Sequence, residues 1–227
     1  MVSGPYAAAL IGWREAVAAI YREVRDTHAA DPRAAWRRFR EQRDELYRDH
    51  PCSALTNDEK ALFDGFDYHA YDPQFCFTGD VDYEVEQLAL DTQTSEGTLS
   101  FRRIAVARFR RLNTVHSLDL YWLDIYGGGL WLPVGDKTNG ATSYGGGRDL
   151  FDTSKGANLG ISAGGKQIVL DFNFLYPPSC SINPAWICPL CPQANRLPFA
   201  IEAGEQCWAS PISPGVHSPQ ASAALAE

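Results

Sequence analysis

The chain has 227 residues, of which 45% are hydrophobic and 21% charged, so one domain with a sizeable core is expected. Its formal net charge of -8 argues against a nucleic-acid-binding protein, because nonspecific affinity for nucleic acids depends on Lys and Arg that neutralise phosphates. No stretch approaches the roughly 18 apolar residues of a membrane span, and the first residues lack the apolar core of a secretory signal.

Apolar residues at helical spacing run through the first fifty positions. In residues 6–28 they are Leu10, Trp13, Val17, Ile20, Tyr21 and Val24, which describes one amphipathic helix. A second helix is predicted from Asp31, as its cap, and Pro32, at the first helical position, to about Asp49. Two interpretations of this helical pair stay open: a cover over one face or end of a sheet, or the surface of a homodimer.

The chain then changes from helical to strand-like patterning. Thr56 and Glu59 form a capping box that predicts a short third helix over residues 57–63. From Tyr68 onward, β-branched and aromatic residues cluster in short segments between turn formers, which is typical of an antiparallel sheet. The predicted strands cover residues 76–78, 85–92, 98–109, 117–126, 129–133, 167–174 and 199–202. Asn113 and the glycines at 127–129 mark hairpin turns.

These elements predict an α+β fold that is mainly antiparallel β, with two to three N-terminal helices packed on the sheet. We place a single α+β domain at residues 31–208 and a flexible tail, rich in Ser, Pro and Ala, at 209–227. Because no secretory or membrane segment is evident, we expect a cytoplasmic protein with no membrane or nucleic-acid partner. In that compartment the six cysteines should be reduced, buried or metal-binding rather than paired in disulfides.

The segment from Asp136 to Arg148 is rich in glycine and resembles a phosphate-binding loop only superficially. It lacks both the Gly-Lys-Ser/Thr ending of a P-loop and the Gly-x-Gly-x-x-Gly fingerprint, so no nucleotide cofactor is expected. One interpretation is a tight connection in which Asp136 and Thr138 hydrogen-bond the turn and Arg148 pairs with an acid. The other is a ligand-lining loop in which Arg148 holds a carboxylate or another anion.

In the predicted strand at 167–174, alternation places Leu170, Phe172 and Phe174 on one face and Val169, Asp171 and Asn173 on the other. If the polar face lines the interior of the sheet, a desolvated Asp171 could have a raised pKa suited to acid or base catalysis. If that face meets water, the two residues are structural.

Four cysteines, Cys180, Cys188, Cys191 and Cys207, follow with the spacing C-x7-C-x2-C-x15-C. A C-x2-C pair is a common zinc half-site, so Cys180, Cys188 and Cys191 are candidate zinc ligands. A redox dithiol is the other chemical interpretation. Against zinc, the second half-site lacks a close pair of its own, and no histidine lies nearby in the sequence.

The chain resembles a family known as domain of unknown function 1684, found in bacteria and archaea. The resemblance covers most of the chain and is most specific at Leu132, Pro133, Asp136, Thr138, Gly140, Thr142, Tyr144, Gly147, Arg148, Leu170, Asp171, Phe172, Asn173, Tyr176, Pro178, Cys180, Cys188, Pro189, Leu190, Pro192, Asn195, Leu197, Ile201, Ala203, Gly204 and Glu205. It implies a single α+β domain with a barrel-like or roll-like sheet and no established reaction.

Two departures from the family pattern matter. Cys191 stands where the family tends to have proline, so the resemblance supports only Cys180 and Cys188 as a shared pair. Residues 1–30 lie outside the resemblance and form a member-specific N-terminal helix, a lid or an interface.

We therefore predict a small-molecule-binding, barrel-like protein that acts by acid/base chemistry on an anionic organic substrate. The predicted catalytic residues are Asp171 and Tyr144, for proton transfer, and Arg148, for binding an anionic group. The predicted ligand-binding residues are Asp136, Asn173, Tyr176, Asn195, Trp122 and Tyr68. The alternative is a structural or zinc-stabilised module without catalytic activity, in which zinc is the one candidate cofactor.

Overall fold

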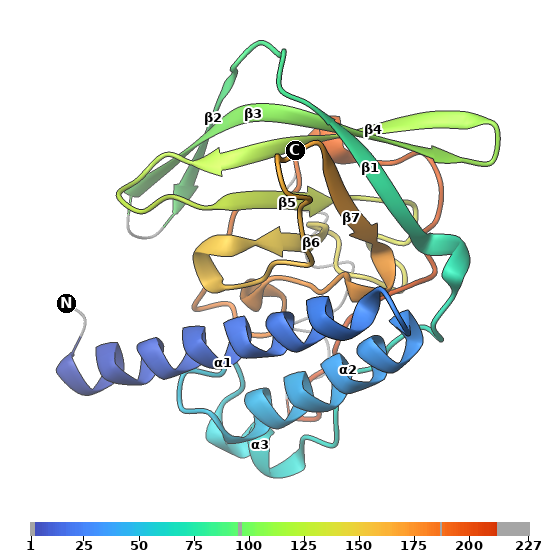
Figure 1. Cartoon of the computed structure of the whole chain (residues 1–227). Helices are drawn as coiled ribbons and strands as arrows, with labels where there is room; N and C mark the ends of the chain where they lie inside the picture. Colours follow the sequence, from blue (N-terminus) through green and yellow to red (C-terminus); the bar gives the residue numbers. More distant parts are fainter. Residues whose placement is uncertain (1–2, 95–96, 187, 213–227) are drawn as a thin grey trace.

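The computed structural model describes residues 3–94, 97–186 and 188–212 (Figure 1). Three helices come first, as predicted: α1 (Gly4–His28), α2 (Pro32–Asp49) and α3 (Asn57–Leu62). The starting signals predicted for α2 and α3 are confirmed, because the Asp31 side chain accepts a hydrogen bond from the backbone N–H of Ala34 and both halves of the capping box of α3 are present.

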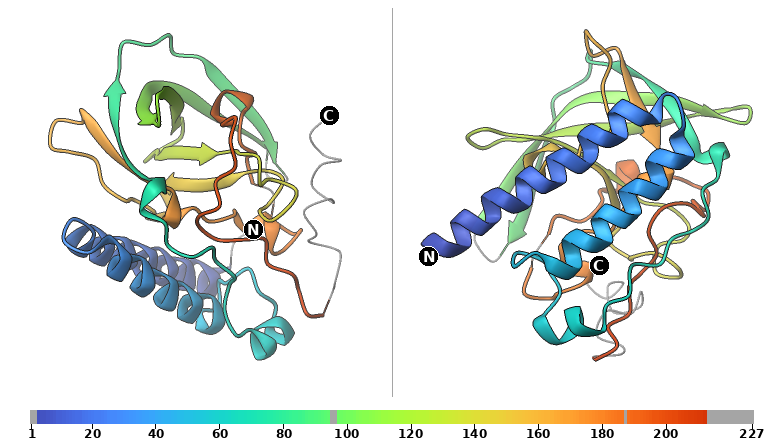
Figure 2. Two further views of the ribbon diagram at one scale, coloured as in Figure 1. Left: turned by 90° about the vertical axis from the view of Figure 1, so that its right-hand side faces the viewer. Right: turned by 60° about the horizontal axis from the view of Figure 1, so that its bottom comes forward.

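The strands form one antiparallel sheet, which confirms the predicted fold class. They are β1 (Cys76–Asp82), β2 (Ala89–Thr94), β3 (Gly97–Arg111), β4 (Thr114–Leu123), β5 (Leu130–Val134), β6 (Arg148–Asp152) and β7 (Gln167–Asp171). The hydrogen-bonded order is β6-β5-β4-β3-β1-β7, and β2 pairs with β3. The sheet curls into a half-barrel, and α1 and α2 pack as an antiparallel pair across its lower side (Figures 1 and 2).

The strand predictions were wrong in three places. Strand β6 was not predicted, and residues 199–202, all of which the structure describes, contain no strand. Strand β7 ends at Asp171, where the aspartate carboxylate accepts a hydrogen bond from the backbone N–H of Asn173 and starts a 3₁₀ turn over Phe172–Phe174. The predicted alternation therefore fails after Asp171, and Phe172, Asn173 and Phe174 are all buried.

A bulge in β3 gives the sheet two apolar faces. The register against β4 pairs Phe101 with Leu123 and Ala105 with Leu120, and it skips Ile104. Because one inserted residue reverses the alternation of the strand, Phe101 and Ala105 point to opposite faces. Ala105 joins the main core, whereas Phe101 joins a smaller cluster with Tyr121 and Trp131.

The helical pair belongs to the main core. Ile20, Tyr21 and Val24 of α1 are buried there beside Phe39 of α2, and fully burying a side chain of this size stabilises the fold by about 1.5–3 kcal/mol. The N-terminal half of α1 extends beyond α2, and its Ile11 is 60% exposed (Figure 1). The homodimer predicted through these helices stays a prediction.

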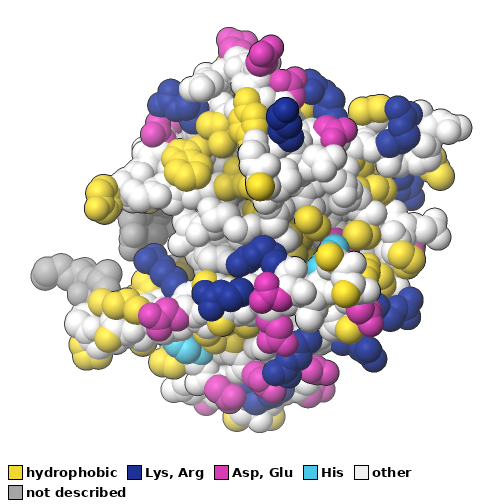
Figure 3. All heavy atoms as spheres, in the orientation of Figure 1, with side chains coloured by type: hydrophobic (Ala, Val, Ile, Leu, Met, Phe, Trp, Pro, Cys, Tyr) yellow, Lys and Arg dark blue, Asp and Glu magenta, His cyan; other side chains and the backbone are white. Residues whose placement is uncertain are grey.

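Charges of both signs are interspersed over the helical layer on the face that Figure 3 shows. In the described part of the chain, α1 and the other helices all lack the combination of length and apolarity that crossing a bilayer requires. The predicted tail at 209–227 falls mostly on residues 213–227, which lie outside the described residues, while Ser210 is buried and donates a hydrogen bond to Glu59 at 2.6 Å.

Candidate functional site

Strand β6 is unusual because all five of its residues are buried although three of them are charged. Its register against β5 pairs Pro133 with Asp149 and Trp131 with Asp152, and it skips Leu150. Paired residues share a face, so the bulge at Leu150 places Asp149 and Asp152 together on the face of Trp131, whereas regular alternation would separate them. Two carboxylates are thereby brought to the smaller apolar cluster of the sheet.

Two small cavities meet at Asp149 and Lys155. The first has a volume of about 90 Å³ and lies between the sheet and the residues that follow β6. Its apolar wall consists of Leu99, Phe101, Leu123, Trp131 and Pro189, and Cys188 adds a thiol. The second, of about 50 Å³, lies between the helical pair and residues 176–179 and is also lined by Tyr21 and Arg43. Asp149 and Lys155 therefore border both spaces.

Asp149 is the electrostatic centre of this site. It is 6% exposed, and the indole Nε1 of Trp131 donates to its Oδ1 at 2.9 Å. Burial raises the pKa of Asp149 to about 7, Lys155 opposes this shift, and Asp152 adds to it. A carboxyl group with this pKa exchanges its proton near neutral pH, which is the property that a general acid or base requires.

Lys155 and Asp152 form an ion pair at the edge of the cavities. Lys155 ends the 3₁₀ turn Thr153–Lys155, and its Nζ lies 2.7 Å from Asp152 Oδ2. The Lys155 side chain is 51% exposed, while that of Asp152 is 9% exposed. Burial acts to raise the pKa of Asp152, but the Lys155 ammonium and the hydrogen bonds from Lys155 and Ser154 together outweigh it, and the pKa is lowered. A positive charge is thus held at the edge of both cavities.

A pair of thiols adjoins the first cavity. The thiol of Cys188 hydrogen-bonds the sulfur of Cys180 and lowers the pKa of Cys180 to about 7, against the effect of burial. The Tyr144 hydroxyl lies 3.6 Å from Cys180 Sγ and adds to the same shift. The same hydrogen bond raises the pKa of Cys188. Of the two thiols, Cys180 is therefore the one whose ionisation this arrangement favours.

The second cavity contains a polar group that none of the described residues satisfies. Tyr21 is 3% exposed, and its hydroxyl has no hydrogen-bond partner among the described residues. Buried polar atoms are seldom left without a partner, so this hydroxyl is available to a water molecule or a ligand. Tyr176, one of the predicted ligand-binding residues, lines the same cavity under Arg43, whose guanidinium lies 4.8 Å from the ring centre.

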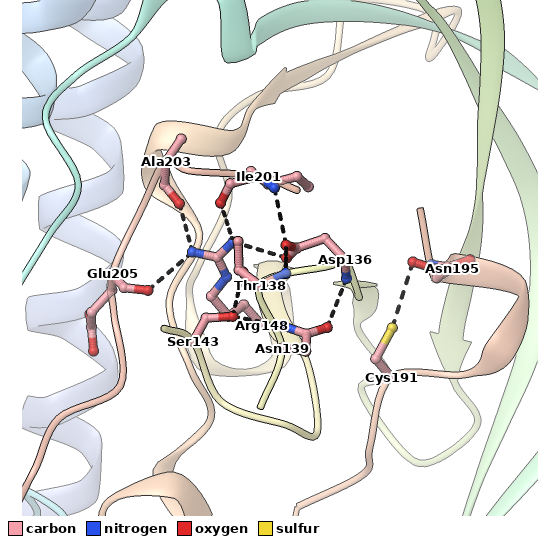
Figure 4. A network of polar contacts seen from close by, with 10 residues as sticks. All are labelled: Asp136, Thr138, Asn139, Ser143, Arg148, Cys191, Asn195, Ile201, Ala203 and Glu205. Carbon is pink, nitrogen blue, oxygen red and sulfur yellow. Dashed lines mark hydrogen bonds and ion pairs between the residues drawn. The ribbon is translucent and has the colours of Figure 1, made fainter. Parts of the chain in front are cut away.

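Other predicted site residues lie in buried networks away from these cavities. Arg148 is 0% exposed; its Nη2 lies 3.0 Å from Asp136 Oδ2, and its two Nη atoms also donate to the backbone carbonyls of Ile201, Ala203 and Glu205 (Figure 4). Burial lowers the pKa of Arg148, which Asp136 opposes. This arrangement matches the interpretation in which Arg148 pairs with an acid.

The side chains of Asn195 and Tyr68 also make hydrogen bonds within the protein. The Asn195 Nδ2 donates to the backbone oxygens of Asp119 and Pro133, so it ties the loop at 193–195 to the sheet. The Tyr68 hydroxyl donates a hydrogen bond of 3.1 Å to the carboxylate of Glu205. The same carboxylate accepts a hydrogen bond from Arg43. Trp122, predicted to line the ligand site, is 40% exposed on β4.

Asp171 and Asn173 form a further buried network with the end of α1. The Oδ1 of Asp171 accepts from the Asn173 backbone N–H at 3.0 Å and from its Nδ2 at 2.8 Å. The Oδ2 of Asp171 lies 2.9 Å from His28 Nε2. Within the described ranges, no hydrogen bond joins these residues to Arg148, so Asp171 and Arg148, which were predicted to act in one site, belong to separate networks.

The cysteines predicted as zinc ligands do not gather at one point. Cys180 and Cys188 are paired, but Cys191 is buried elsewhere, with its Sγ 3.7 Å from the backbone oxygen of Asn195. As far as the structure describes the chain, these three sulfurs form no group close enough to share an ion.

Asp149, Lys155 and Tyr21 were not among the predicted site residues. Asp149 lies in the sequence RDLFD, for which no strand was predicted. The available signal was the concentration of Asp149, Asp152 and Lys155 within seven residues. Sequence alone could not show that a bulge turns both carboxylates toward one cavity.

Comparisons with known proteins give a family and a fold. A family model described as a protein of unknown function, DUF1684, matches residues 61–206. The solution NMR structure of an uncharacterized protein from Haloarcula marismortui is similar, with 28% sequence identity and a TM-score of 0.59. The similarity covers 80% of this chain and 97% of that one. A search of curated proteins found no match.

Proposed function

We propose that this chain, which belongs to the DUF1684 family of proteins of unknown function, binds a small organic molecule beside Asp149. Asp149 then transfers a proton to or from that molecule. The observation that carries the proposal is the position of Asp149, a buried carboxyl group with a pKa of about 7, at the junction of two cavities. Buried acids at such junctions are the groups expected to exchange protons with a ligand.

The lining of the two cavities favours one class of ligand. The wall of Leu99, Phe101, Leu123 and Trp131 suits an apolar body, and the Lys155 ammonium suits an anionic group, which would share it with Asp152. Lys155 thus takes the anion-binding role that the sequence suggested for Arg148, whose two Nη atoms each make two hydrogen bonds within the protein. The hydroxyl of Tyr21, which has no partner in the described part of the chain, supplies a further donor or acceptor in the second cavity.

The hydrogen bond from Trp131 makes proton exchange at Asp149 measurable. The indole N–H signal of Trp131 in a ¹⁵N-labelled sample can be assigned with a Trp131→Phe variant and followed as the pH changes. Because the indole donates to Asp149 Oδ1, we expect its chemical shift to titrate with a midpoint near pH 7 and to lose this titration in Asp149→Asn. A signal that does not titrate between about pH 5 and 9 would remove Asp149 from the proposed role.

Ligand binding can be read from the same signal. Small carboxylic acids such as benzoate serve as probes, and we expect one or more of them to shift the Trp131 indole resonance. Lys155→Met should weaken that binding at least roughly tenfold, since it removes the charge that faces an anion. Lys137→Met, at an exposed lysine outside the cavities, is the matched control. If no probe reaches the signal, or if Lys155→Met has no effect, the alternative of a structural module without a ligand is favoured.

A second candidate function rests on the thiol pair. With a pKa of about 7, Cys180 can act as a nucleophile at neutral pH. In the test reaction with p-nitrophenyl acetate, the thiolate sulfur attacks the ester carbonyl, a thioester forms and p-nitrophenolate leaves. Mass spectrometry should find one acetyl group on Cys180, absent in Cys180→Ser. Acetylation distributed over other residues would argue against this candidate.

A further inference from the structure

Three side chains of different chemistry meet where α1 ends against the sheet. They are His28, the last residue of α1, Cys76, the first residue of β1, and Asp171, the last residue of β7. A ring nitrogen of His28, the sulfur of Cys76 and a carboxylate oxygen of Asp171 all lie within 4.8 Å of one another. No other group of three potential metal-ligand atoms this close is present in the part of the chain that the structure describes.

The fold holds two of these residues in place through its backbone. Cys76 and Asp171 are direct partners in the antiparallel ladder of β1 and β7, and such partners project side by side from the same face. His28 is brought to them by the packing of α1 on the core, and its Nε2 lies 2.9 Å from Asp171 Oδ2. The three groups therefore come from three rigid elements rather than from a loop, which is how precise sites are built.

The carboxylate of Asp171 is oriented by neighbours that leave one oxygen for the cluster. Its Oδ1 accepts hydrogen bonds from the backbone N–H and the Nδ2 of Asn173, while its Oδ2 faces His28 and, at 3.4 Å, the hydroxyl of Tyr71. Asn173 is itself held, because its side chain exchanges hydrogen bonds with the backbone of Asp72. Outer hydrogen bonds of this kind fix the ligands of metal sites.

We propose that His28, Cys76 and Asp171 bind a single Zn²⁺ ion. Imidazole nitrogen, thiolate sulfur and carboxylate oxygen are the ligands that zinc takes in proteins, whereas Mg²⁺ and Ca²⁺ are bound by oxygen alone. Around a tetrahedral ion with bonds of about 2.0 Å, ligand nitrogen and oxygen atoms lie about 3.3 Å apart, so His28 and Asp171 need to separate by only a few tenths of an ångström.

The site offers a fourth position to another ligand. The His28 side chain is 15% exposed and Cys76 is partly buried, so solvent reaches the cluster. The Tyr71 hydroxyl lies 3.4 Å from Asp171 Oδ2 and is a second candidate for this position. Three protein ligands with one open position are the pattern of zinc sites that bind water or a substrate. This site differs from the sequence prediction, which placed zinc at Cys180, Cys188 and Cys191.

Metal content and cobalt spectroscopy test the proposal. Purified full-length protein should contain zinc at about one equivalent by elemental analysis, and Co²⁺ added after chelation should give a sulfur-to-cobalt charge-transfer band. Cys76→Ser and His28→Gln should lose the zinc and the band. Cys207→Ser and His116→Gln, which change the same residue types elsewhere, should retain both.

One further variant separates a metal site from a purely structural role. Asn173→Ala keeps all three ligands but removes the Nδ2 donor to Asp171, so zinc affinity should fall about 10- to 100-fold while binding persists. Should Cys76→Ser or His28→Gln fail to fold, the cobalt spectrum of the unmodified protein decides. A spectrum without a sulfur band, zinc retained in the folded Cys76→Ser variant, or zinc lost only on changing Cys180 or Cys188, would each overturn the assignment.

Discussion

The guanidinium of Arg148 lies 3.0 Å from the carboxylate of Asp136, and both side chains are wholly buried. Asp136 Oδ1 also accepts hydrogen bonds from the backbone N–H groups of Thr138 at 2.7 Å and Ile201 at 3.1 Å, so the pair links the Gly-rich loop to the distant segment at residues 201–205. An ion removed from water in this way is tolerated only while its partner and hydrogen bonds are in place.

Removing one member of this pair should therefore strongly destabilise the fold. Arg148→Met keeps most of the side-chain volume but leaves Asp136 charged and unpaired, and we expect the free energy of unfolding to fall by about 3–5 kcal/mol in urea titrations. Arg108→Met, which breaks an ion pair with Asp82 at the surface, should change it by less than about 1 kcal/mol. If the two variants lost equal amounts of unfolding free energy, burial would not be what makes the Arg148–Asp136 pair important for stability.

Asp149 predicts a distinctive dependence of stability on pH. Its pKa is 3.8 in an ordinary environment and about 7 in the fold, so the folded state keeps a proton that the unfolded state has lost. The contribution of Asp149 to stability is complete below about pH 4 and is lost as the pH rises to about 7. Its full size is on the order of 4 kcal/mol, because one pKa unit corresponds to about 1.4 kcal/mol.

The test compares the unfolding free energies of the unmodified protein and Asp149→Asn at several pH values. The difference between them should decrease from about pH 4 to pH 7 and then remain level. Asp82→Asn is a control with the opposite sign, because Arg108 lowers the pKa of Asp82 and its contribution grows as pH rises. A difference for Asp149→Asn that grows with pH would show that the folded state prefers the carboxylate.

Gly147, directly before β6, should not tolerate a side chain. Its φ of 93° lies in the left-handed region, and an added Cβ would lie 2.4 Å from the Cβ of Cys191. We expect Gly147→Ala to destabilise the protein by about 2–5 kcal/mol, which combines the backbone conformation with overpacking. Gly127→Ala has a similar φ of 84°, but no atom of the described residues lies within 4 Å of the new Cβ, so thermal unfolding should show a loss of only about 1–2 kcal/mol.

The sequence was most informative where structure is local. Asp31 and the capping box of Thr56 and Glu59 act within one turn, so the beginnings of α2 and α3 could be placed closely. The bulges in β3 and β6 leave no comparable signal, because one inserted residue is identified only by its partner strand. Strand β6 was missed for a related reason. Its charged residues have no local preference for a buried strand, and only the packing of the whole fold buries them.

The candidate site was harder to predict than the fold. The sequence drew attention to Arg148 and Asp171, and both are buried polar residues, but charges alone could not reveal which buried groups border a cavity. Cys180 and Cys188 were noted from the cysteine spacing and singled out as a pair by the resemblance to a family, and their sulfurs do lie together. Asp149 depends on the bulge at Leu150, so its position could not be inferred before the sheet was known.

The thiol pair predicts selective reactivity at Cys180. Iodoacetamide reacts with thiolates, so the rate of alkylation at Cys180 should rise with pH to a plateau with a midpoint near pH 7. Burial raises the pKa of Cys191 to about 12, which makes Cys191 the internal control that stays unmodified in the same digest.

Cys188→Ala removes the thiol that donates to Cys180 and should move the midpoint of Cys180 alkylation to higher pH. Tyr144→Phe should move it in the same direction by less, because the hydroxyl contributes less than Cys188 to the shift. A midpoint for Cys180 near that of a free thiol, unchanged in Cys188→Ala, would mean that the two sulfurs titrate independently.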